Sequence, residues 1–279
     1  MIKTLGVQCY SVRTEMKQDT FSAIDKLKDI GFDALEPMIL PMDAPCVLPP
    51  VAWAMDNLAE NAAYVRSKGM EIPSAHIMAD LKRFCLPPIE MAEALKKIHQ
   101  IVGTKYFVFS IMFQTAEDAK AEGEYLCQVQ RQIKADGLQV LYHNHAQELD
   151  MVEIGGKTMT ALEYFLRFAG EDILLELDIG WAGFAGDDLA YVKKFADRIA
   201  ILHLKDFTEE AVNHQYHLDT IPTEAFVAIG DGAIHTKQII GFAEDMPRFS
   251  GIAIIDQDHA ATDILQELER GYQFVKQLD

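Results

Sequence analysis

Short apolar runs alternate with longer amphipathic stretches along the whole chain. The runs are TLGVQCYS, GFDALEP, MEIPSAH, TKYFVFS, LQVLYHNH, DILLELDIG, IAILHLKD and GIAIIDQD, and each ends in or near a polar residue. Runs of this length, rich in β-branched and aromatic residues, predict strands. Glycines stand at positions typical of a left-handed cap after a helix, namely Gly31, Gly69, Gly103, Gly137 and Gly170.

The stretches between these runs have the spacing of helices. In MAEALKKIHQIV, for example, apolar residues recur at three- and four-residue intervals, as in Leu95, Ile98 and Val102. Strands that alternate with helices imply crossover connections and a parallel sheet. Eight such units within 279 residues predict a closed (β/α)8 TIM barrel that forms a single domain, 1–279. The alternative, an open doubly wound sheet, usually has a glycine-rich turn after its first strand, and QCYSVRTE is not such a turn.

Two segments interrupt the regular alternation. PMILPMDAPCVLPPVAW follows the second run, and its prolines are incompatible with a helix or a central strand. The stretch 207–232, after the seventh run, is too long for a simple turn. In a barrel both segments would emerge at the carboxyl ends of the strands, where the active sites of TIM barrels lie.

Charge and composition exclude several classes of function. The chain carries 43 acidic and 25 basic residues, a net charge of −18, and no cluster of Lys and Arg. This charge disfavours binding to nucleic acids and acidic membranes. We find no apolar run of about 18 residues that could span a bilayer and no signal peptide. Four cysteines occur singly, without CxxC pairs, which indicates reduced thiols and a cytoplasmic protein.

Polar residues mark the ends of the predicted strands. In a barrel these ends converge, and side chains two residues apart on a strand point to the same side. The sequence therefore predicts a polar pocket formed by Gln8, Glu36, His76, Ser110, His143, Asp178, His203 and Asp256, with Tyr10, Ser74, His145, Glu176, Lys205 and Asp258 beside them.

Four of these residues have the chemistry of a metal site. His143, Asp178, His203 and Asp256 offer two imidazoles and two carboxylates, which suits a divalent cation such as Mn²⁺, Zn²⁺ or Co²⁺. Taken singly, each is more often a polar residue hydrogen-bonded at a strand end. Taken together on four strands, they favour a metal site. Trp181 is as compatible with the core as with a pocket wall.

The chain resembles the xylose isomerase-like TIM-barrel superfamily, often called sugar phosphate isomerase/epimerase. The resemblance rests on GVQCYSVR, YHNHAQEL, LELDIGWAG, ILHLKDF, AIGDGAIHTKQII and IAIIDQD, and inosose dehydratase is among the similar members. It implies a divalent metal held by His143, Asp178, His203 and Asp256. Many epimerases of the superfamily have Glu at the positions of His143 and Asp256 and use both as an acid–base pair, so that mechanism does not carry over directly. His143 and His145 share a face, and either could be the ligand.

The expected function is that of a metal-dependent isomerase or epimerase of a sugar or related polyol. A base would remove the proton next to a carbonyl and give an enediolate. The candidate catalytic residues are His145, as acid or base, Lys205, which would neutralise oxyanion charge, and His143. In the alternative interpretation, His145 only holds its loop through Glu148 or Asp178. The candidate substrate-binding residues are Gln8, Tyr10, Glu36, His76, Glu148, Trp181 and Asp258.

Three other functions are considered. A lyase or dehydratase, similar to inosose dehydratase, would begin with the same proton abstraction on a keto-sugar or keto-inositol and then expel a leaving group. A non-catalytic sugar-binding protein is disfavoured by the intact set of metal ligands. An endonuclease of the same superfamily is disfavoured by the acidic surface and by the lack of a clustered set of metal ligands beyond one site. The identity of the sugar, its phosphorylation and the presence of a homo-oligomer are left open.

Overall fold

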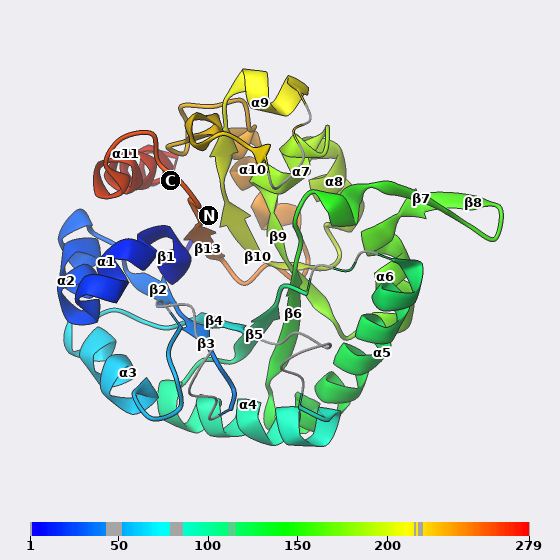
Figure 1. Ribbon diagram of the computed structural model, residues 1–279, viewed down its shortest axis with the longest axis horizontal. Coiled ribbons are helices and arrows are strands. Elements are labelled where there is room, and N and C mark those ends of the chain that lie inside the picture. Colours follow the sequence, from blue (N-terminus) through cyan, green and yellow to red (C-terminus); the bar gives the residue numbers. More distant parts are fainter. Residues whose placement is uncertain are drawn as a thin grey trace.

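The computed structural model describes residues 2–42, 52–78, 86–111, 113, 115–214, 216 and 220–278. Its centre is a parallel sheet of nine strands in the order β2-β1-β13-β10-β9-β6-β5-β4-β3 (Figure 1). The strands are β1 (Thr4–Gln8), β2 (Ala34–Glu36), β3 (Met38–Ile39), β4 (Ser74–Ile77), β5 (Tyr106–Phe109), β6 (Gln139–His143), β9 (Leu174–Asp178), β10 (Ile199–Leu204) and β13 (Ile252–Ile255).

The sheet nearly closes on itself at Pro37. This proline separates β2 from β3, which lie at the two ends of the strand order although they are consecutive in the chain. β2 pairs with β1, whereas β3 pairs with β4. Backbone hydrogen bonds from Leu35 N to Glu71 O and from His76 N to Pro37 O, both of 2.9 Å, join the two ends. Together β2 and β3 therefore occupy one of the barrel's strand positions, and the predicted (β/α)8 fold is confirmed.

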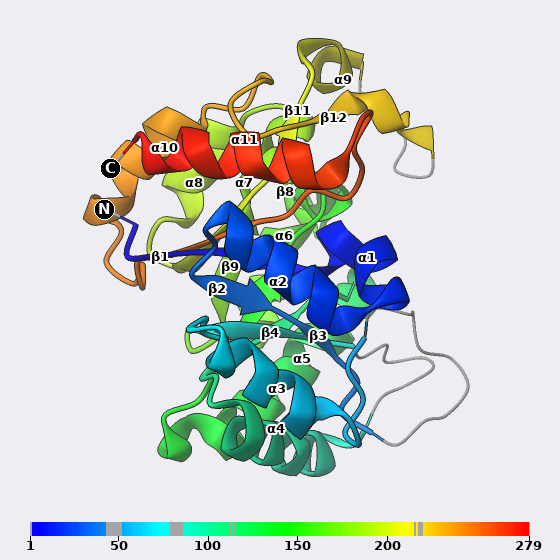
Figure 2. The ribbon, with the colours of Figure 1, turned by 90° about the vertical axis from the view of Figure 1, so that its left-hand side faces the viewer.

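Helices surround the sheet on its outer side (Figures 1 and 2). The last helix packs beside the first long one, where the ring of Tyr272 lies 5.1 Å from the ring of Phe32. The helices are α1 (Arg13–Gln18), α2 (Thr20–Ile30), α3 (Leu58–Ser67), α4 (Pro88–Val102), α5 (Ala116–Ile133), α6 (Ala161–Ala169), α7 (Ile179–Phe184), α8 (Asp188–Phe195), α9 (Glu209–His214), α10 (Thr236–Phe242) and α11 (Ile264–Lys276).

Each predicted run contains a strand of the barrel, but some local predictions need correction. Gly31, Gly103 and Gly137 adopt the expected left-handed conformation. Gly69 and Gly170 also have a positive φ, but ψ of Gly170 is 179°, outside the left-handed helical region. The sequence patterns also missed a hairpin, β7 (Met151–Ile154) with β8 (Lys157–Thr160), which projects from the barrel in Figure 1. Its polar, glycine-containing sequence lacks the apolar alternation by which buried strands are recognised.

The barrel interior is layered because inward-facing residues recur every second position. An apolar layer is formed by Val108, Leu141, Leu174, Ala200, Ile201 and Ile254. Two residues further along four of the strands come polar side chains, all buried, at His143, Glu176, His203 and Asp256. Buried charges are costly unless they are paired or bind a metal, so this second layer needs a chemical explanation.

The two irregular segments lie where the strands end. Of the proline-rich segment, 43–51 lies outside the described residues. The segment after β10 contains β11 (Asp206–Phe207), α9 and β12 (Phe226–Val227), with β11 and β12 antiparallel. The Asp206 carboxylate accepts hydrogen bonds from the backbone N–H groups of Phe207, Gly230, Gly232 and Ile234 at 2.9–3.2 Å. One buried side chain thus holds this segment against the barrel.

Replacing Asp206 by asparagine should lower the free energy of unfolding by about 1–3 kcal/mol, because buried donors lose a charged acceptor. Urea denaturation followed by circular dichroism measures the change. Asp231→Asn is the matched control in the same loop, since its ion pair with Arg270 is exposed and worth at most about 1 kcal/mol. Equal stability of the two variants would contradict the assigned role of Asp206.

Two further observations concern the cysteines and the helices. Cys9 and Cys127 are free thiols, while Cys46 and Cys85 lie outside the described residues. Within the part of the chain that the structure describes, no helix combines the length and the apolar character needed to cross a membrane.

Candidate functional site

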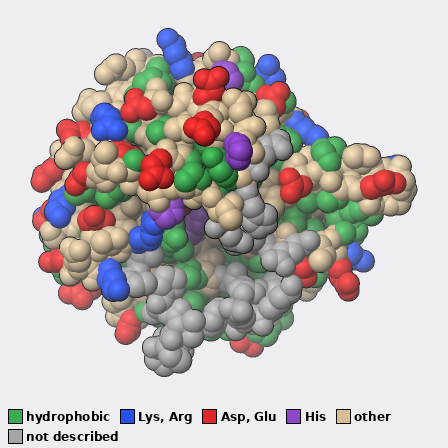
Figure 3. All heavy atoms as spheres, turned by 45° about the horizontal axis from the view of Figure 1, so that its top comes forward, with side chains coloured by type: hydrophobic (Ala, Val, Ile, Leu, Met, Phe, Trp, Pro, Cys, Tyr) green, Lys and Arg blue, Asp and Glu red, His purple; other side chains and the backbone are tan. Residues whose placement is uncertain are grey.

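Four side chains from neighbouring strands meet at the carboxyl end of the barrel. One nitrogen or oxygen of each of His143, Asp178, His203 and Asp256 lies within 4.8 Å of the others, and all four residues are buried. They come from β6, β9, β10 and the residue that follows β13. The structure thus brings together the complete metal-ligand set that the sequence predicted. Figure 3 shows histidine side chains beside a hollow on this face.

The residues present fit a divalent cation. Asp178 Oδ2, His203 Nδ1 and Asp256 Oδ1 are buried and have no hydrogen-bond partner among the described residues. Unsatisfied buried polar atoms are rare in folded proteins, and here three of them point into one cluster. Two imidazole nitrogens and two carboxylate oxygens match the preferences of Zn²⁺, Mn²⁺ or Co²⁺.

The position of Asp178 is fixed by its neighbours. Its Oδ1 accepts the N–H of Trp181 at 2.8 Å and so caps α7, which leaves Oδ2 for the cluster. The Asn144 side chain accepts from Asp178 N at 3.0 Å and donates to Asp178 O at 3.3 Å. A Cβ on Gly180 would lie 2.7 Å from the carbonyl oxygen of Lys205. Only glycine therefore allows α7 to pack so closely on the residue after β10.

Lys205 is a buried cation beside the cluster. Its Nζ donates to Asp256 Oδ2 at 2.8 Å and to Asp258 Oδ2 at 2.7 Å, and lies 3.4 Å from Asp178 Oδ2. Burial lowers the pKa of Lys205, but the charges of Asp256, Asp258 and Asp178 outweigh burial and hold the pKa above its usual value. The ammonium group also lies 4.8 Å from the Trp181 ring centroid. Lys205 therefore carries its charge at neutral pH.

A second group of possible metal ligands, which the sequence did not predict, shares His143 and His203 with the first. His76, His143, Glu176 and His203 also converge within 4.8 Å. Glu176 Oε2 is 2.8 Å from His76 Nε2, 3.3 Å from His143 Nδ1 and 3.3 Å from His203 Nε2. The sequence pattern predicted Glu176 beside the pocket but indicated no role for it, because no local motif marks a carboxylate that acts through other side chains.

Glu36 completes this inner network. It accepts from Gln8 Nε2 at 2.7 Å and from the Ser74 hydroxyl, and His203 Nε2 and His76 Nε2 lie 3.0 and 3.2 Å from Oε1. Burial raises the pKa of Glu36, but the positive charges of His76 and His203 outweigh burial and hold the pKa well below its usual value. Glu36 is fully buried, so its position favours a role in orienting histidines over direct contact with a substrate.

The other carboxylates of the site differ in how strongly nearby charges counteract the rise in pKa that burial causes. Burial and the charge of Glu36 raise the pKa of Glu176 to about 7. Burial raises the pKa of Asp178 to about 6, although the nearby charge of Lys205 acts in the opposite direction. For Asp256, burial is outweighed by the charge of Lys205, and the pKa lies well below its usual value. These carboxylates thus differ widely in proton affinity.

The histidines differ just as widely. Burial lowers the pKa of His76, but the charges of Glu36 and Glu176 outweigh burial and raise the pKa to about 9. His203 is likewise raised well above its usual pKa, because the neighbouring carboxylates outweigh burial. Burial and the positive charge of His203 hold the pKa of His143 well below its usual value. In the metal-free protein His76 is therefore protonated and His143 is neutral.

His145 lies nearer the rim than His143, as the alternation of the strand predicts. Its side chain is 21% exposed, against 3% for His143. Burial and the charge of Lys205 lower its pKa to about 3, so the ring is neutral near pH 7. Its backbone N–H donates to Glu148 Oε2 at 3.0 Å, whereas the ring Nδ1 lies 4.0 Å from Glu148 Oε1 and has no hydrogen-bond partner among the described residues.

The remaining predicted site residues differ in how accessible their side chains are to a substrate. Gln8 and Glu148 are buried and bonded within the protein: Gln8 Oε1 accepts Tyr10 N at 3.2 Å, and Glu148 Oε1 accepts the Tyr142 hydroxyl at 3.1 Å. Tyr10 is half-buried, and Arg13 lies over its ring at 4.4 Å. These contacts favour a supporting role for Gln8 and Glu148.

Two other predicted residues are better placed for a substrate. The Asp258 side chain is 19% exposed. Trp181 packs 5.9 Å from His145 between ring centroids and has a buried indole N–H without a hydrogen-bond partner among the described residues. Trp181 therefore belongs to a buried hydrophobic cluster and also contacts His145, a position compatible with both interpretations that its sequence context allowed.

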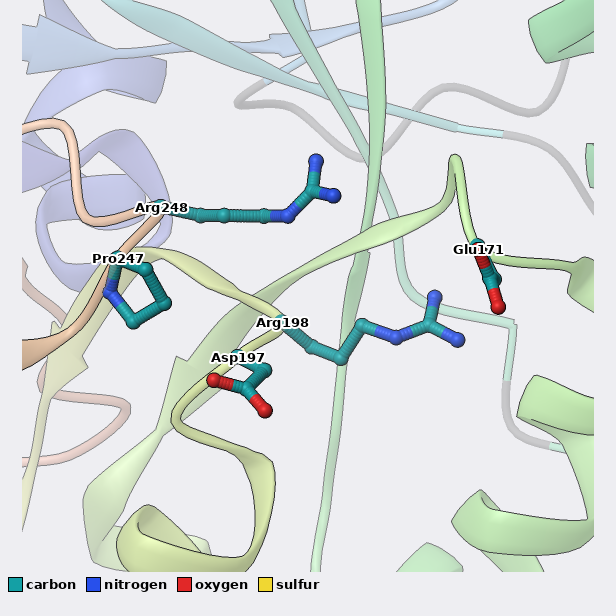
Figure 4. A pocket seen from close by; sticks show the side chains of 5 residues that line it. All are labelled: Glu171, Asp197, Arg198, Pro247 and Arg248. Atoms are coloured by element: carbon teal, nitrogen blue, oxygen red, sulfur yellow. The ribbon is translucent and has the colours of Figure 1, made fainter.

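A separate cavity lies at the opposite end of the barrel. Its volume is about 410 Å³, and Figure 4 shows its lining side chains, Glu171, Asp197, Arg198, Pro247 and Arg248. These residues precede β9, β10 and β13, whereas the donor clusters lie at the carboxyl ends of the strands. Arg198 Nη1 donates to Gly170 O and Ile173 O, which gives it a structural function.

Comparison with known proteins identifies relatives of part of the chain. An inosose dehydratase from Serratia proteamaculans is 23% identical over 155 residues, 52% of this chain and 50% of that protein. The chain spans about half the length, or less, of the curated relatives it matches. Their activity is therefore not transferred to this chain on similarity alone.

Solved structures extend the likeness over nearly the whole chain. A sugar phosphate isomerase/epimerase from Parabacteroides distasonis superposes with a TM-score of 0.75 at 18% identity, covering 99% of this chain and 94% of that one. A xylose isomerase-like TIM barrel protein from Mycobacterium smegmatis in complex with magnesium gives 0.70 at 12% identity, covering 99% and 96%. At these identities the likeness shows the fold.

The family model adds the decisive match. The model described as xylose isomerase-like TIM barrel matches residues 24–278, which includes every member of both donor clusters. The resemblance inferred from the strand-end motifs is thereby confirmed, and the chain belongs to the xylose isomerase-like TIM barrel family.

Proposed function

We propose that the protein is a metal-dependent isomerase or epimerase of a sugar or related polyol that abstracts a proton next to a carbonyl. The observation that carries this proposal is the buried group His143, Asp178, His203 and Asp256, with the Lys205 ammonium 2.8 Å from Asp256. The group combines four metal-ligand atoms with a fixed positive charge, and both stabilise negative charge that develops on oxygen.

The four residues would hold one cation among Mn²⁺, Zn²⁺ and Co²⁺, which when bound acidifies the C–H next to a carbonyl. Lys205 would stabilise the enediolate oxygen, since it remains charged and its position is fixed by three carboxylates. Asp258, which is partly exposed, and the Trp181 ring, which packs against His145 and Lys205, would bind and orient the substrate. His143 would act as a ligand and not as an acid or base, because it belongs to the four-donor cluster whereas His145 does not.

His145 is the proposed base. Its pKa is lowered to about 3, so the ring is neutral near pH 7, and its side chain is 21% exposed. Because Nδ1 is buried, Nε2 is the nitrogen that would face a substrate. A neutral imidazole with a free nitrogen can accept a proton from carbon. The lowered pKa makes the neutral ring a weaker base and the protonated ring a stronger acid, so removal of the proton requires an acidified C–H, while its return to the intermediate is favoured. Removal followed by return is the sequence that an isomerase or epimerase needs.

The second candidate is a lyase or dehydratase that acts on a keto-sugar or keto-inositol. Two observations favour it: the similarity to inosose dehydratase, and His76, whose raised pKa of about 9 keeps it protonated and whose side chain is 12% exposed. A protonated imidazole that is partly exposed could protonate a departing hydroxyl group. Both candidate reactions share the proton abstraction and differ in the second step.

One experiment tests the proposal and separates the two reactions. The protein, loaded with Mn²⁺ or Co²⁺, is incubated with a panel of keto-sugars and inososes in D₂O, and the products are analysed by NMR and mass spectrometry. Deuterium next to the carbonyl without loss of water supports the isomerase or epimerase. An unsaturated product that lacks one water supports the lyase. No reaction with any substrate by a protein that binds neither cation would contradict both.

Replacing His145 by alanine should reduce turnover by about 10²-fold, the usual contribution of a general base, and should leave metal content unchanged. Turnover is measured with saturating metal, and metal content by elemental analysis. His235→Ala is the control, because His235 is half-exposed and bonds to Asp188 on α8. Loss of metal would instead make His145 a ligand, and near-normal turnover would remove it from the mechanism.

A further inference from the structure

The two buried glutamates behind the metal cluster contact nitrogens of the same histidines that face the cluster. His203 Nε2 lies 3.0 Å from Glu36 Oε1 and 3.3 Å from Glu176 Oε2, while its Nδ1 lies 3.4 Å from Asp256 Oδ2. The ring therefore stands between two sets of carboxylates. Its Nε2 is engaged by the inner set, and its Nδ1 is the nitrogen that faces the cluster.

In His143 the two ring nitrogens have exchanged roles relative to His203. Its Nδ1 lies 3.3 Å from Glu176 Oε2, so Nε2 is the nitrogen left for the metal cluster. A carboxylate accepts hydrogen bonds, so the nitrogen that faces it carries the hydrogen. In the neutral His203 ring the hydrogen stays on Nε2, 3.0 Å from Glu36, because Nδ1 is farther from its carboxylate, 3.4 Å from Asp256. Glu36 and Glu176 thus favour one tautomer of each neutral ring, and that tautomer offers the lone pair of its other nitrogen to a cation.

The inner donors are better explained as a hydrogen-bonded network than as a second cation site. The 2.8 Å distance from His76 Nε2 to Glu176 Oε2 is that of a charge-assisted hydrogen bond. A cation bound there together with one in the outer cluster would need both nitrogens of His143 and of His203 at once. Neutral imidazole has only one free nitrogen lone pair, so the two sites could not both be filled without removing a further proton from each ring.

Hydrogen bonds from residues outside the metal cluster also hold the two glutamates in place. Glu36 is held by Gln8 Nε2 at 2.7 Å and by the Ser74 hydroxyl. His76 bridges the two carboxylates through one nitrogen, 3.2 Å from Glu36 and 2.8 Å from Glu176. Each glutamate is fully buried, so water cannot take over these bonds.

We infer that Glu36 and Glu176 are positioning residues, which fix the tautomer and ring orientation of His203 and His143 and so set the affinity of the outer cluster for its cation. This inference rests on the proposed metal-dependent function. Outer hydrogen-bond partners of metal-binding histidines typically change metal affinity by about 10–100-fold when they are replaced.

The test compares metal binding by the wild-type protein, Glu176→Gln and Glu36→Gln. Metal-free proteins are titrated with Mn²⁺ and with Co²⁺ by calorimetry, and the visible absorption of bound Co²⁺ is recorded. Asp188→Asn is the matched control, since Asp188 is also a buried carboxylate bonded to an imidazole, that of His235 at 2.9 Å, but lies on α8. Thermal unfolding without metal separates a change in fold stability from a change in affinity.

We expect one cation per chain in every protein. The dissociation constants of both glutamine variants should rise by about 10–100-fold, and the Co²⁺ bands should shift because the ligand geometry changes. Asp188→Asn should match the wild type in both respects. If Glu176→Gln does not fold, Glu176→Asp replaces it: this variant keeps the charge but withdraws the oxygen, and we expect weaker binding for it as well.

Two results would overturn the inference alone. One is wild-type affinity and an unchanged Co²⁺ spectrum in the folded glutamate variants. The other is a second cation in the wild type that is lost in Glu176→Gln, which would make the inner group a binding site. If the wild type binds neither cation, the proposed function fails, and the inference fails with it.

Discussion

Replacing His203 by alanine should abolish metal binding at the concentrations that saturate the wild-type protein. His203 supplies the Nδ1 that lies 3.4 Å from Asp256, and its ring is fully buried between two sets of carboxylates. Replacing a residue that only orients a metal ligand weakens metal binding by about 10–100-fold. Loss of the ligand itself should weaken binding by more than this. Turnover of any identified substrate should fall with it. Metal content after dialysis and calorimetric titration measure the effect.

Because the alanine variant also leaves Glu36 and Glu176 with one imidazole fewer, a second variant is needed. Asp178→Asn keeps the size of the side chain and removes its negative charge, and it should bind the cation far more weakly than the wild type. His99→Ala is the control, since His99 bonds to the carbonyl of Thr104 beyond the helix α4. Unchanged metal affinity in folded His203→Ala and Asp178→Asn would remove the outer cluster as the metal site.

Replacing Lys205 by methionine should both destabilise the protein and impair catalysis. The ammonium group lies within 3.4 Å of three carboxylate oxygens, from Asp178, Asp256 and Asp258. Removing one partner of a buried ion pair costs about 3–5 kcal/mol, because the remaining charges are left uncompensated. Loss of a preorganised positive charge near a developing oxyanion should reduce turnover by about 10²–10³-fold. Urea denaturation and steady-state kinetics measure the two effects.

A divalent cation should restore part of the lost stability of Lys205→Met, since it would neutralise Asp178 and Asp256. Lys134→Met is the control: its ion pair with Asp172 is exposed, and its loss should cost at most about 1 kcal/mol. Stability of Lys205→Met equal to that of this control would show that the three carboxylates do not depend on the lysine. Unimpaired turnover at saturating metal would exclude Lys205 from catalysis.

The donors of the site were predictable from sequence because each lies at a fixed place in a repeated unit. His143, Asp178, His203 and Asp256 all lie within one residue of the end of a strand, and alternation along strands placed His145 and Lys205 beside them. Strand ends in a closed barrel must converge. The position of a residue in the repeated unit therefore indicates which side chains lie close together in the fold. The two-residue interval between Ile201 and His203, or Ile254 and Asp256, likewise places the polar layer above the apolar one.

The sequence did not predict which partners each polar side chain contacts. Glu36 and His76 were expected to bind substrate hydroxyls, yet both contact the inner network, and Glu36 is fully buried. Asn144 lies between the two prominent histidines, and its side chain bonds to the backbone of Asp178. These contacts join residues far apart in sequence, and their geometry depends on the rotamers and register of packed strands.

The sequence by itself determined the barrel, the strand ends and the chemical types at the site, because hydrophobic periodicity and strand-end position are local properties of the chain. The tertiary structure alone decided three other features: the joining of the sheet at Pro37, the neutral state of His145, and the division of the polar layer into an outer cluster and an inner network. Burial, proton affinity and the choice between a ligand and its support depend on which charges are brought within a few ångströms of one another, and only folding sets those distances.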